Sequence, residues 1–112
     1  MEEIRLDQYS TGVIVFAKGH GFAYDDWLIL VSRAETRNLG EHINYFICIN
    51  LNTNEVYFNE SGICGWGYTT WHDLYSPTKE QKMKVINALA ERGYKYTPIW
   101  RKLIKQKNNG KS

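Results

Sequence analysis

The chain has 112 residues, of which 43% are hydrophobic, 23% charged and 14% aromatic. These proportions are typical of one globular domain and exclude a multidomain enzyme. No apolar run reaches the ~18 residues of a membrane span. The Met1-Glu2-Glu3 start is acidic, whereas a secretory signal begins with a basic and then an apolar stretch. We therefore expect a soluble, cytoplasmic protein that makes no contact with a membrane, with one domain over residues 1–105 and a basic flexible tail over residues 106–112.

Charge is distributed unevenly along the chain. Residues 1–91 hold all 12 acidic residues and 7 basic ones, a net charge of −5, whereas the last 21 residues hold 7 basic residues and no acidic one. A basic end of this kind can bind nucleic acid or an acidic protein face. It can equally keep a small protein in solution or lie against its own acidic body.

Two short apolar runs open the predicted sheet. Residues 12–17 and residues 27–31 are almost entirely aliphatic or aromatic. Each run is too short for a helix of ordinary length, so both are predicted to be strands that are buried on both faces.

The clearest hairpin lies in the middle of the chain. Asn52, Thr53 and Asn54 form a predicted turn, because asparagine tolerates the left-handed backbone that a tight turn needs. Residues 55–58 form the second strand. The first strand, residues 43–51, alternates and is expected to place Ile43, Tyr45, Ile47, Ile49 and Leu51 on one face and Asn44, Phe46, Cys48 and Asn50 on the other.

A further strand is predicted over residues 63–71. Its glycines, Gly65 and Gly67, together with Gly62 just before it, are expected to weaken or bend it, or to let another backbone approach closely.

One helix follows this strand. Either Ser76 caps it, with Pro77 in the first turn, or Thr78 caps it in a capping box with Gln81. Gly93 is a natural stop. Its apolar stripe is predicted to consist of Met83, Ile86, Leu89 and Ala90, with Val85 at the edge.

The last predicted element is a small hairpin around Pro98, with strands over residues 94–97 and 99–104. About five short strands, one C-terminal helix and this hairpin indicate an α+β fold. The sheet is expected to be a small bent antiparallel sheet or an SH3-like barrel whose open side the helix covers.

The C-terminal segment also resembles a known module. The run Thr78-Lys79-Glu80-Gln81-Lys82, the apolar helix, the strand that begins at Gly93-Tyr94 and a Leu-Ile-Lys ending are similar to a segment of short proteins from gut Bacteroidales and their phages. The resemblance covers about the last 30 residues. It differs in having Tyr96 where those proteins have tryptophan, and Thr97-Pro98 at the turn. It implies a phage or mobile-element accessory protein and carries no catalytic residues.

Cys64, His72 and Asp73 are the strongest candidates for chemistry, as the nucleophile, base and orienting carboxylate of a cysteine-dependent hydrolase. If residues 63–71 are extended, Cys64 and His72 lie about 26 Å apart, and they converge only if the segment folds back. His20 or His42 could serve as the base instead. A free cysteine is most often a small buried residue. Neither Cys64 nor Cys48 has the spacing of a zinc ligand, and no histidine pair has ligand spacing. We therefore expect no cofactor, no metal and no enzymatic activity.

Aromatic residues are the more informative signal. The 16 aromatic residues exceed what so small a core hides comfortably, so some are expected on the surface. The alternative is that large rings supply core volume. Seven of these residues gather in two glycine-rich segments: Phe22, Tyr24, Trp27, Trp66, Tyr68, Trp71 and Tyr75.

Two functions follow from these surfaces. The leading hypothesis is a non-enzymatic binding module of the accessory or inhibitor kind, acting through an aromatic surface on a protein partner or by self-association. The alternative is a nucleic-acid-binding protein that uses the basic aromatic C-terminal hairpin, unless its rings pack the helix onto the sheet. The candidate binding residues are Trp66, Tyr68, Trp71, Tyr96, Trp100, Arg101 and Lys102.

Overall fold

A computed structural model of the chain describes residues 12–19, 25–37, 40–59, 64–68, 72–97 and 102–105. For residues 34–37, 40–41, 64–68, 72, 97 and 102–105 it describes the backbone alone. The predicted tail, residues 106–112, lies outside the described residues. In the part of the chain that is described, no helix has the length and apolar character needed to cross a membrane.

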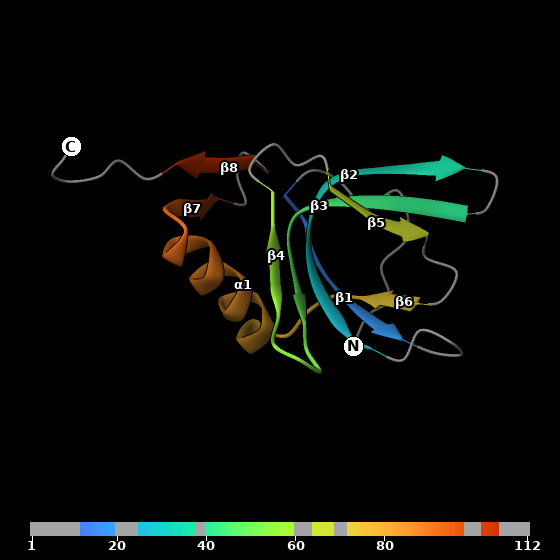
Figure 1. Cartoon of the computed structure of the whole chain (residues 1–112), viewed down its shortest axis with the longest axis horizontal. Coiled ribbons are helices and arrows are strands. Elements are labelled where there is room, and N and C mark those ends of the chain that lie inside the picture. Colours follow the sequence, from blue (N-terminus) through green and yellow to red (C-terminus); the bar gives the residue numbers. More distant parts are fainter. Residues whose placement is uncertain are drawn as a thin grey trace, which may run out of the picture.

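The fold is α+β, as the sequence predicts, and its main sheet is antiparallel and bent (Figure 1). The strands run in the order β4-β3-β2-β1-β6, and β5 pairs with β3 on the same side as β4. The strand predicted over residues 63–71 corresponds to β5, and β6, which follows it at residues 72–75, is a strand that the sequence analysis does not predict. The six strands of this sheet are β1 (Ile14–Gly19), β2 (Trp27–Arg37), β3 (Gly40–Asn50), β4 (Val56–Phe58), β5 (Cys64–Tyr68) and β6 (His72–Tyr75).

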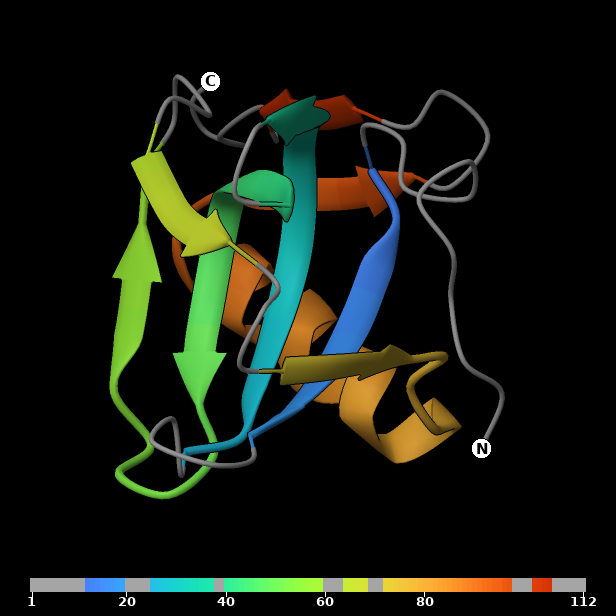
Figure 2. The same cartoon turned by 90° about the vertical axis from the view of Figure 1, so that its right-hand side faces the viewer.

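The sheet curls over on one side. Figure 2 shows β6 passing in front of β1 and β2, with α1 (Lys79–Glu91) behind the sheet. A cluster of buried side chains fills the curled side, and every member comes from a strand: Val15, Ala17, Ile29, Val31, Ile43, Tyr45, Cys48 and Leu74. We call this the enclosed side.

The other side of the sheet is covered by the helix α1. Strand residues such as Phe16, Leu28 and Ile49 pack there against Val85 and Leu89 of α1. Tyr94 from β7 (Tyr94–Thr97) completes this second cluster. We call this the helix side. Both faces of the central strands are therefore buried, as their continuous apolar runs predict.

The alternation predicted for residues 43–51 is wrong. Leu30 pairs with Ile47 and Val31 pairs with Tyr45, so Phe46 is an extra residue on β3. Such a bulge reverses which face the later side chains occupy. Ile43 and Tyr45 accordingly belong to the enclosed side, whereas Ile47 and Ile49 belong to the helix side.

The predicted turn after β3 is confirmed. Asn54 has a φ of 66°, the left-handed conformation that asparagine tolerates. Buried Asn50 organises the turn, because its Oδ1 accepts from the backbone N–H groups of Asn52 at 2.8 Å and Thr53 at 3.1 Å. Its Nδ2 donates to Asp25 Oδ2 at 3.0 Å, which ties this turn to the start of β2.

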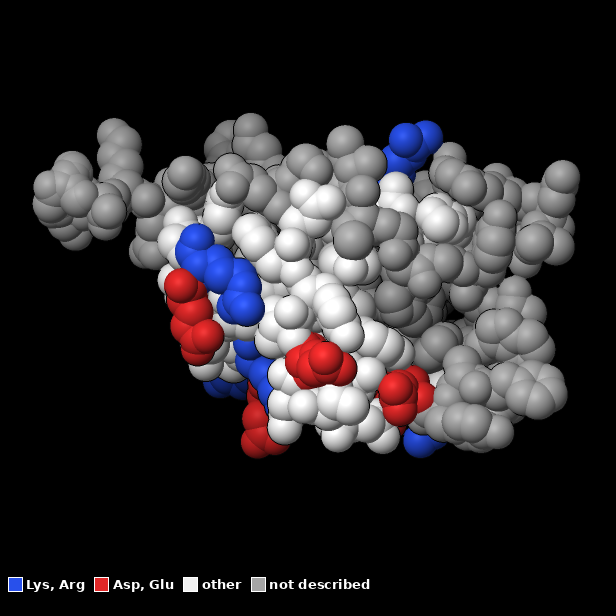
Figure 3. All heavy atoms as spheres, in the orientation of Figure 1, with Lys and Arg blue, Asp and Glu red and all other residues white. Residues whose placement is uncertain are grey.

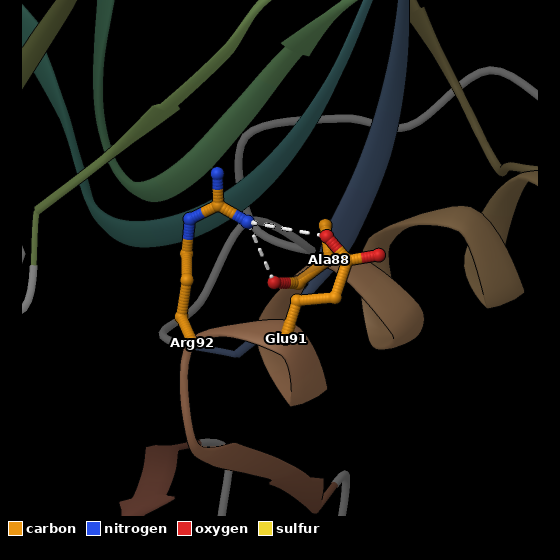
Figure 4. A network of polar contacts seen from close by, with 3 residues as sticks. All are labelled: Ala88, Glu91 and Arg92. Carbon is orange, nitrogen blue, oxygen red and sulfur yellow. Dashed lines mark hydrogen bonds and ion pairs between the residues drawn. The ribbon is translucent and has the colours of Figure 1, made fainter.

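Thr78 caps α1, which decides between the two predicted caps. Its Oγ1 accepts from the N–H of Gln81 at 3.1 Å, and Gln81 Oε1 accepts from the N–H of Thr78 at 2.9 Å. The helix stops where Gly93 takes a φ of 83°. Arg92 Nη1 donates to the carbonyl of Ala88 at 2.9 Å beside the Glu91 carboxylate, which satisfies one of the last carbonyls (Figure 4).

The predicted apolar stripe of the helix is partly wrong. Val85, Ala88 and Leu89 are the buried residues of α1. Met83 is 43% exposed and Ala90 is exposed as well. The stripe is rotated because the helix crosses the sheet on the Val85–Leu89 line, which places Met83 beside the β3–β4 turn and not under the sheet.

The predicted C-terminal hairpin is confirmed. Strand β7 pairs with β8 (Lys102–Lys105) in an antiparallel two-stranded sheet, with Tyr96 opposite Leu103. It packs beside the end of α1 (Figure 1).

Candidate functional site

The candidate binding residues predicted from the sequence fall into three groups. Trp71, Trp100 and Arg101 lie outside the described residues. Trp66, Tyr68 and Lys102 are described by their backbone alone, in β5 and β8. Of these residues only Tyr96 has a described side chain.

Tyr96 contributes to the fold. Its ring packs against the helix-side cluster, and its hydroxyl donates to the carbonyl of Gly12 at 2.7 Å. Tyr94, two residues earlier, is buried. Because β7 places Lys95 on its other face, the described part of this hairpin turns lysine and not tyrosine outward.

Register shows how the hairpin distributes its positive charge. Thr97 lies opposite Lys102 and Lys95 opposite Ile104, so Lys95 and Lys102 occupy the same face of the hairpin. This basic face can contact phosphates. The Tyr94 and Tyr96 rings do not lie on it, so they do not stack on a base that is bound there.

The backbone separates the residues of the candidate catalytic triad. Cys64 pairs with Tyr45 of β3, whereas His72 pairs with Gly19 of β1. Asp73 follows His72 in the strand, so it lies on the opposite face of β6 from His72. It stands exposed and opposite Lys18, which leaves it unsuited to orient the His72 ring.

The other titratable groups of the described residues form no metal centre. No group of three or more histidine, cysteine or acidic side chains gathers there. His42 Nε2 lies 2.9 Å from Asn44 Oδ1, and Cys48 is a buried free thiol.

An open groove runs between α1 and the β3–β4 hairpin, and we call it the α1–β4 groove. It consists of two adjoining hollows of about 490 and 290 Å³ that share Lys84 and Asn87. The first is lined by Leu51, Glu80, Gln81, Met83, Lys84 and Asn87, and the second by Ile49, Asn54, Val56, Lys84, Asn87, Ala88 and Glu91.

The groove has an apolar floor and a rim of both charges. Lys84 Nζ reaches from α1 to the turn and donates to Asn54 Oδ1 at 3.3 Å. Glu80 and Glu91 stand toward the two ends of the helix. Figure 3 shows the uncharged surface of this face between flanking patches of red and blue. The lining therefore places apolar side chains next to one lysine and two carboxylates.

A second exposed apolar group lies on the other face of the same edge. Tyr57 is 41% exposed and its ring centre lies 6.0 Å from that of Trp27. Partial desolvation and, next, the negative charge of Glu55 raise the pKa of the Tyr57 hydroxyl above its ordinary value. An exposed ring of this kind combines apolar contact area with a polar tip.

Two large apolar residues of the described part are exposed although the sequence does not predict it. The helical periodicity places Met83 in the core stripe, and Tyr57 reads as part of an ordinary strand. The signal for Tyr57 was its place in a short strand after a tight turn, which is how an edge strand begins. For Met83 the sequence holds no signal, since its exposure depends on the crossing angle of α1.

Comparison with known proteins adds no family to this description. No family model, no curated protein and no solved structure matches the chain.

Proposed function

We propose that the protein is a non-enzymatic binding module that captures a protein partner through the α1–β4 groove and the adjoining edge strand β4. The observation that carries this proposal is the pairing of an open apolar groove with the two most exposed large apolar side chains of the described residues, Met83 and Tyr57. Exposed methionine suits such a role, because its unbranched side chain adapts to different partner surfaces.

The position of these residues supports the proposal. Met83 lines the first hollow and Val56 of β4 lines the second, so a bound segment contacts side chains and the free strand edge together. Grooves that combine apolar contacts with main-chain hydrogen bonds are a recurring means of binding extended segments of other proteins.

The biological setting is part of the same proposal. The resemblance of residues 78–105 to proteins of gut Bacteroidales and their phages supports an accessory or inhibitor-type role in a mobile element. A protein of this kind acts by occupying a surface of its partner, and it needs no nucleophile or cofactor.

The second candidate function is nucleic-acid binding by the C-terminal hairpin. Its support is the shared face of Lys95 and Lys102, together with the basic charge of the last 21 residues. It ranks second because Tyr94 and Tyr96, two of the rings that would stack on bases, pack into the fold.

The groove is tested with a displayed library of random peptides. We expect the library to yield peptides that bind the native chain. Met83→Glu should lower their affinity at least about tenfold, since one charge in the apolar floor costs about 1.4 kcal/mol or more of binding free energy. Ala90→Glu is the matched control, because it adds the same charge to an exposed site of the same helix outside the groove. The proposal fails if no peptide is selected, or if the selected peptides bind the Met83→Glu protein as well as the control.

Nucleic-acid binding by the C-terminal hairpin is tested separately, with oligonucleotides. Single-stranded DNA and RNA oligonucleotides should bind with an affinity that falls steeply with salt, and Arg101→Glu with Lys102→Glu should remove this binding. Absent or salt-insensitive binding eliminates the candidate.

A further inference from the structure

The outer edge of β4 has a defined set of backbone groups. Asn50 N–H donates to the Glu55 carbonyl at 2.9 Å and Asn59 N–H donates to the Phe46 carbonyl at 2.8 Å. In an antiparallel ladder, hydrogen-bonded pairs alternate with non-hydrogen-bonded pairs. The backbone groups of residues 55, 57 and 59 therefore face β3, and those of Val56 and Phe58 face away from it.

Within the described residues, β4 pairs with β3 alone, and it forms the left edge of the sheet in Figure 2. Val56 and Phe58 thus present two N–H donors and two carbonyl acceptors along this edge. Proteins commonly protect such edges with charged side chains, proline or a bulge. A short strand is a further protection, and β4 has three residues, but Val56-Tyr57-Phe58 carries no charge, no proline and no bulge.

This inference rests on the proposed binding function and names its partner. We propose that β4 pairs antiparallel with β4 of a second copy of this chain about a two-fold axis. Val56 then lies opposite Phe58 of the other copy, and Tyr57 lies opposite its own counterpart.

Hydrogen bonding selects this register. When Val56 of each copy pairs with Phe58 of the other, all four outward backbone groups of each copy are used and four hydrogen bonds form. Shifting the strands to oppose the two Val56 residues would place Phe58 against Asn54, whose φ of 66° ends the strand. That register loses half of the hydrogen bonds.

Charge is compatible with the same register. Glu55 stands opposite Asn59 of the other copy, so no carboxylate meets another along the described strands. Like charges placed directly opposite would destabilise such a pair. The edge is therefore self-complementary, which a two-fold interface requires.

Side chains complete the contact on both faces. On the helix side, Val56 meets Phe58 of the other copy, a pairing of a β-branched with an aromatic residue that stabilises antiparallel sheets. On the enclosed side the two Tyr57 rings meet in a non-hydrogen-bonded pair, where side chains come closest. Val56 lines the α1–β4 groove of each copy, so the grooves of the two copies border the same dimer interface.

The dimer is reversible, since a three-residue edge alone buries less than a standard interface. It is measured by sedimentation equilibrium of the full chain over a wide concentration range. Tyr57→Lys and Tyr57→Glu should each be monomeric, because each sets like charges opposite one another. An equimolar mixture of the two should form a heterodimer, because lysine then faces glutamate.

Two controls separate this pairing from a change in folding. Lys18→Glu alters an exposed charge on β1 and should leave the dimer unchanged. Val56→Pro removes an outward donor and no β3 hydrogen bond, so it should weaken the dimer while the circular dichroism spectrum stays the same. A monomeric native chain at every concentration overturns the inference, as does a mixture of Tyr57→Lys and Tyr57→Glu that stays monomeric.

The outcomes also distinguish this inference from the proposed function. A monomeric chain whose selected peptides still depend on Met83 overturns self-pairing and leaves the groove a binding site. The opposite result is a dimer in which Tyr57→Lys and Tyr57→Glu complement each other while no selected peptide depends on Met83. That result supports self-pairing and eliminates capture of a foreign segment.

Discussion

The two sides of the sheet are covered in different ways. The enclosed side is filled by the strands themselves, since Val15, Ile29 and Leu74 meet when the sheet curls. The helix side is covered by a separate layer, which Val85 and Leu89 of α1 provide. The difference shows that an antiparallel sheet can bury one face by bending but must recruit another element for the second face. Among the described residues, the α1–β4 groove lies at the border of this added layer.

Removing the main helix contact should produce the largest effect. Leu89 is fully buried, so Leu89→Ala should lower the free energy of unfolding by about 2–5 kcal/mol. Denaturant unfolding measures this loss. Ile29→Ala, equally buried on the enclosed side, should cost a similar amount.

The two variants should differ in where they loosen the protein. Hydrogen exchange should accelerate mainly in α1 and β7 for Leu89→Ala, and across β1–β3 for Ile29→Ala. Equal acceleration in both regions for both variants would show that the two sides open as one unit.

The polar junction between the start of β2 and the end of β3 should have the next largest effect. Asn50→Ala removes the acceptor for two backbone N–H groups and the donor to Asp25, so it should cost about 1–3 kcal/mol. Asn52→Ala removes one exposed contact to the N–H of Asp26 and should cost less than about 1 kcal/mol. If thermal melting finds the two variants equal, Asn50 does not organise the junction.

Gly93 tests how the helix layer ends. No atom lies within 4 Å of an added Cβ, so the cost of Gly93→Ala comes from its φ of 83° and should be about 1–2 kcal/mol. Gly93→Asn should cost less, because asparagine tolerates this conformation. Similar melting temperatures for Gly93→Ala and the native chain would contradict this explanation.

Surface changes on the two sides should have the smallest effect on stability. Tyr57→Lys lies on the enclosed side of the edge and Met83→Glu on the helix side, and both positions are exposed. Met83→Glu should change the free energy of unfolding by no more than about 0.5 kcal/mol. Tyr57→Lys also loses the ring contact with Trp27 and should cost no more than about 1.5 kcal/mol. A much larger loss for either would make that residue part of the core and remove it from the binding surface.

The sequence determined the elements whose signals are local. Apolar runs in β1 and β2, asparagine at the β3–β4 turn, the Thr78 capping box and Gly93 each predict a feature that the structure confirms. Backbone conformation and short-range hydrogen bonds dictate these features, and both depend on residues a few positions apart.

Only the tertiary structure decided which residues face outward at the edge. The Phe46 bulge depends on how β2 and β3 align, and this bulge reverses the faces of Ile47 and Ile49. Exposure of Met83 depends on how α1 crosses the sheet, and the free edge of β4 depends on which strands pair with β3. Each is set by contacts between segments distant in sequence, which periodicity within one segment does not encode.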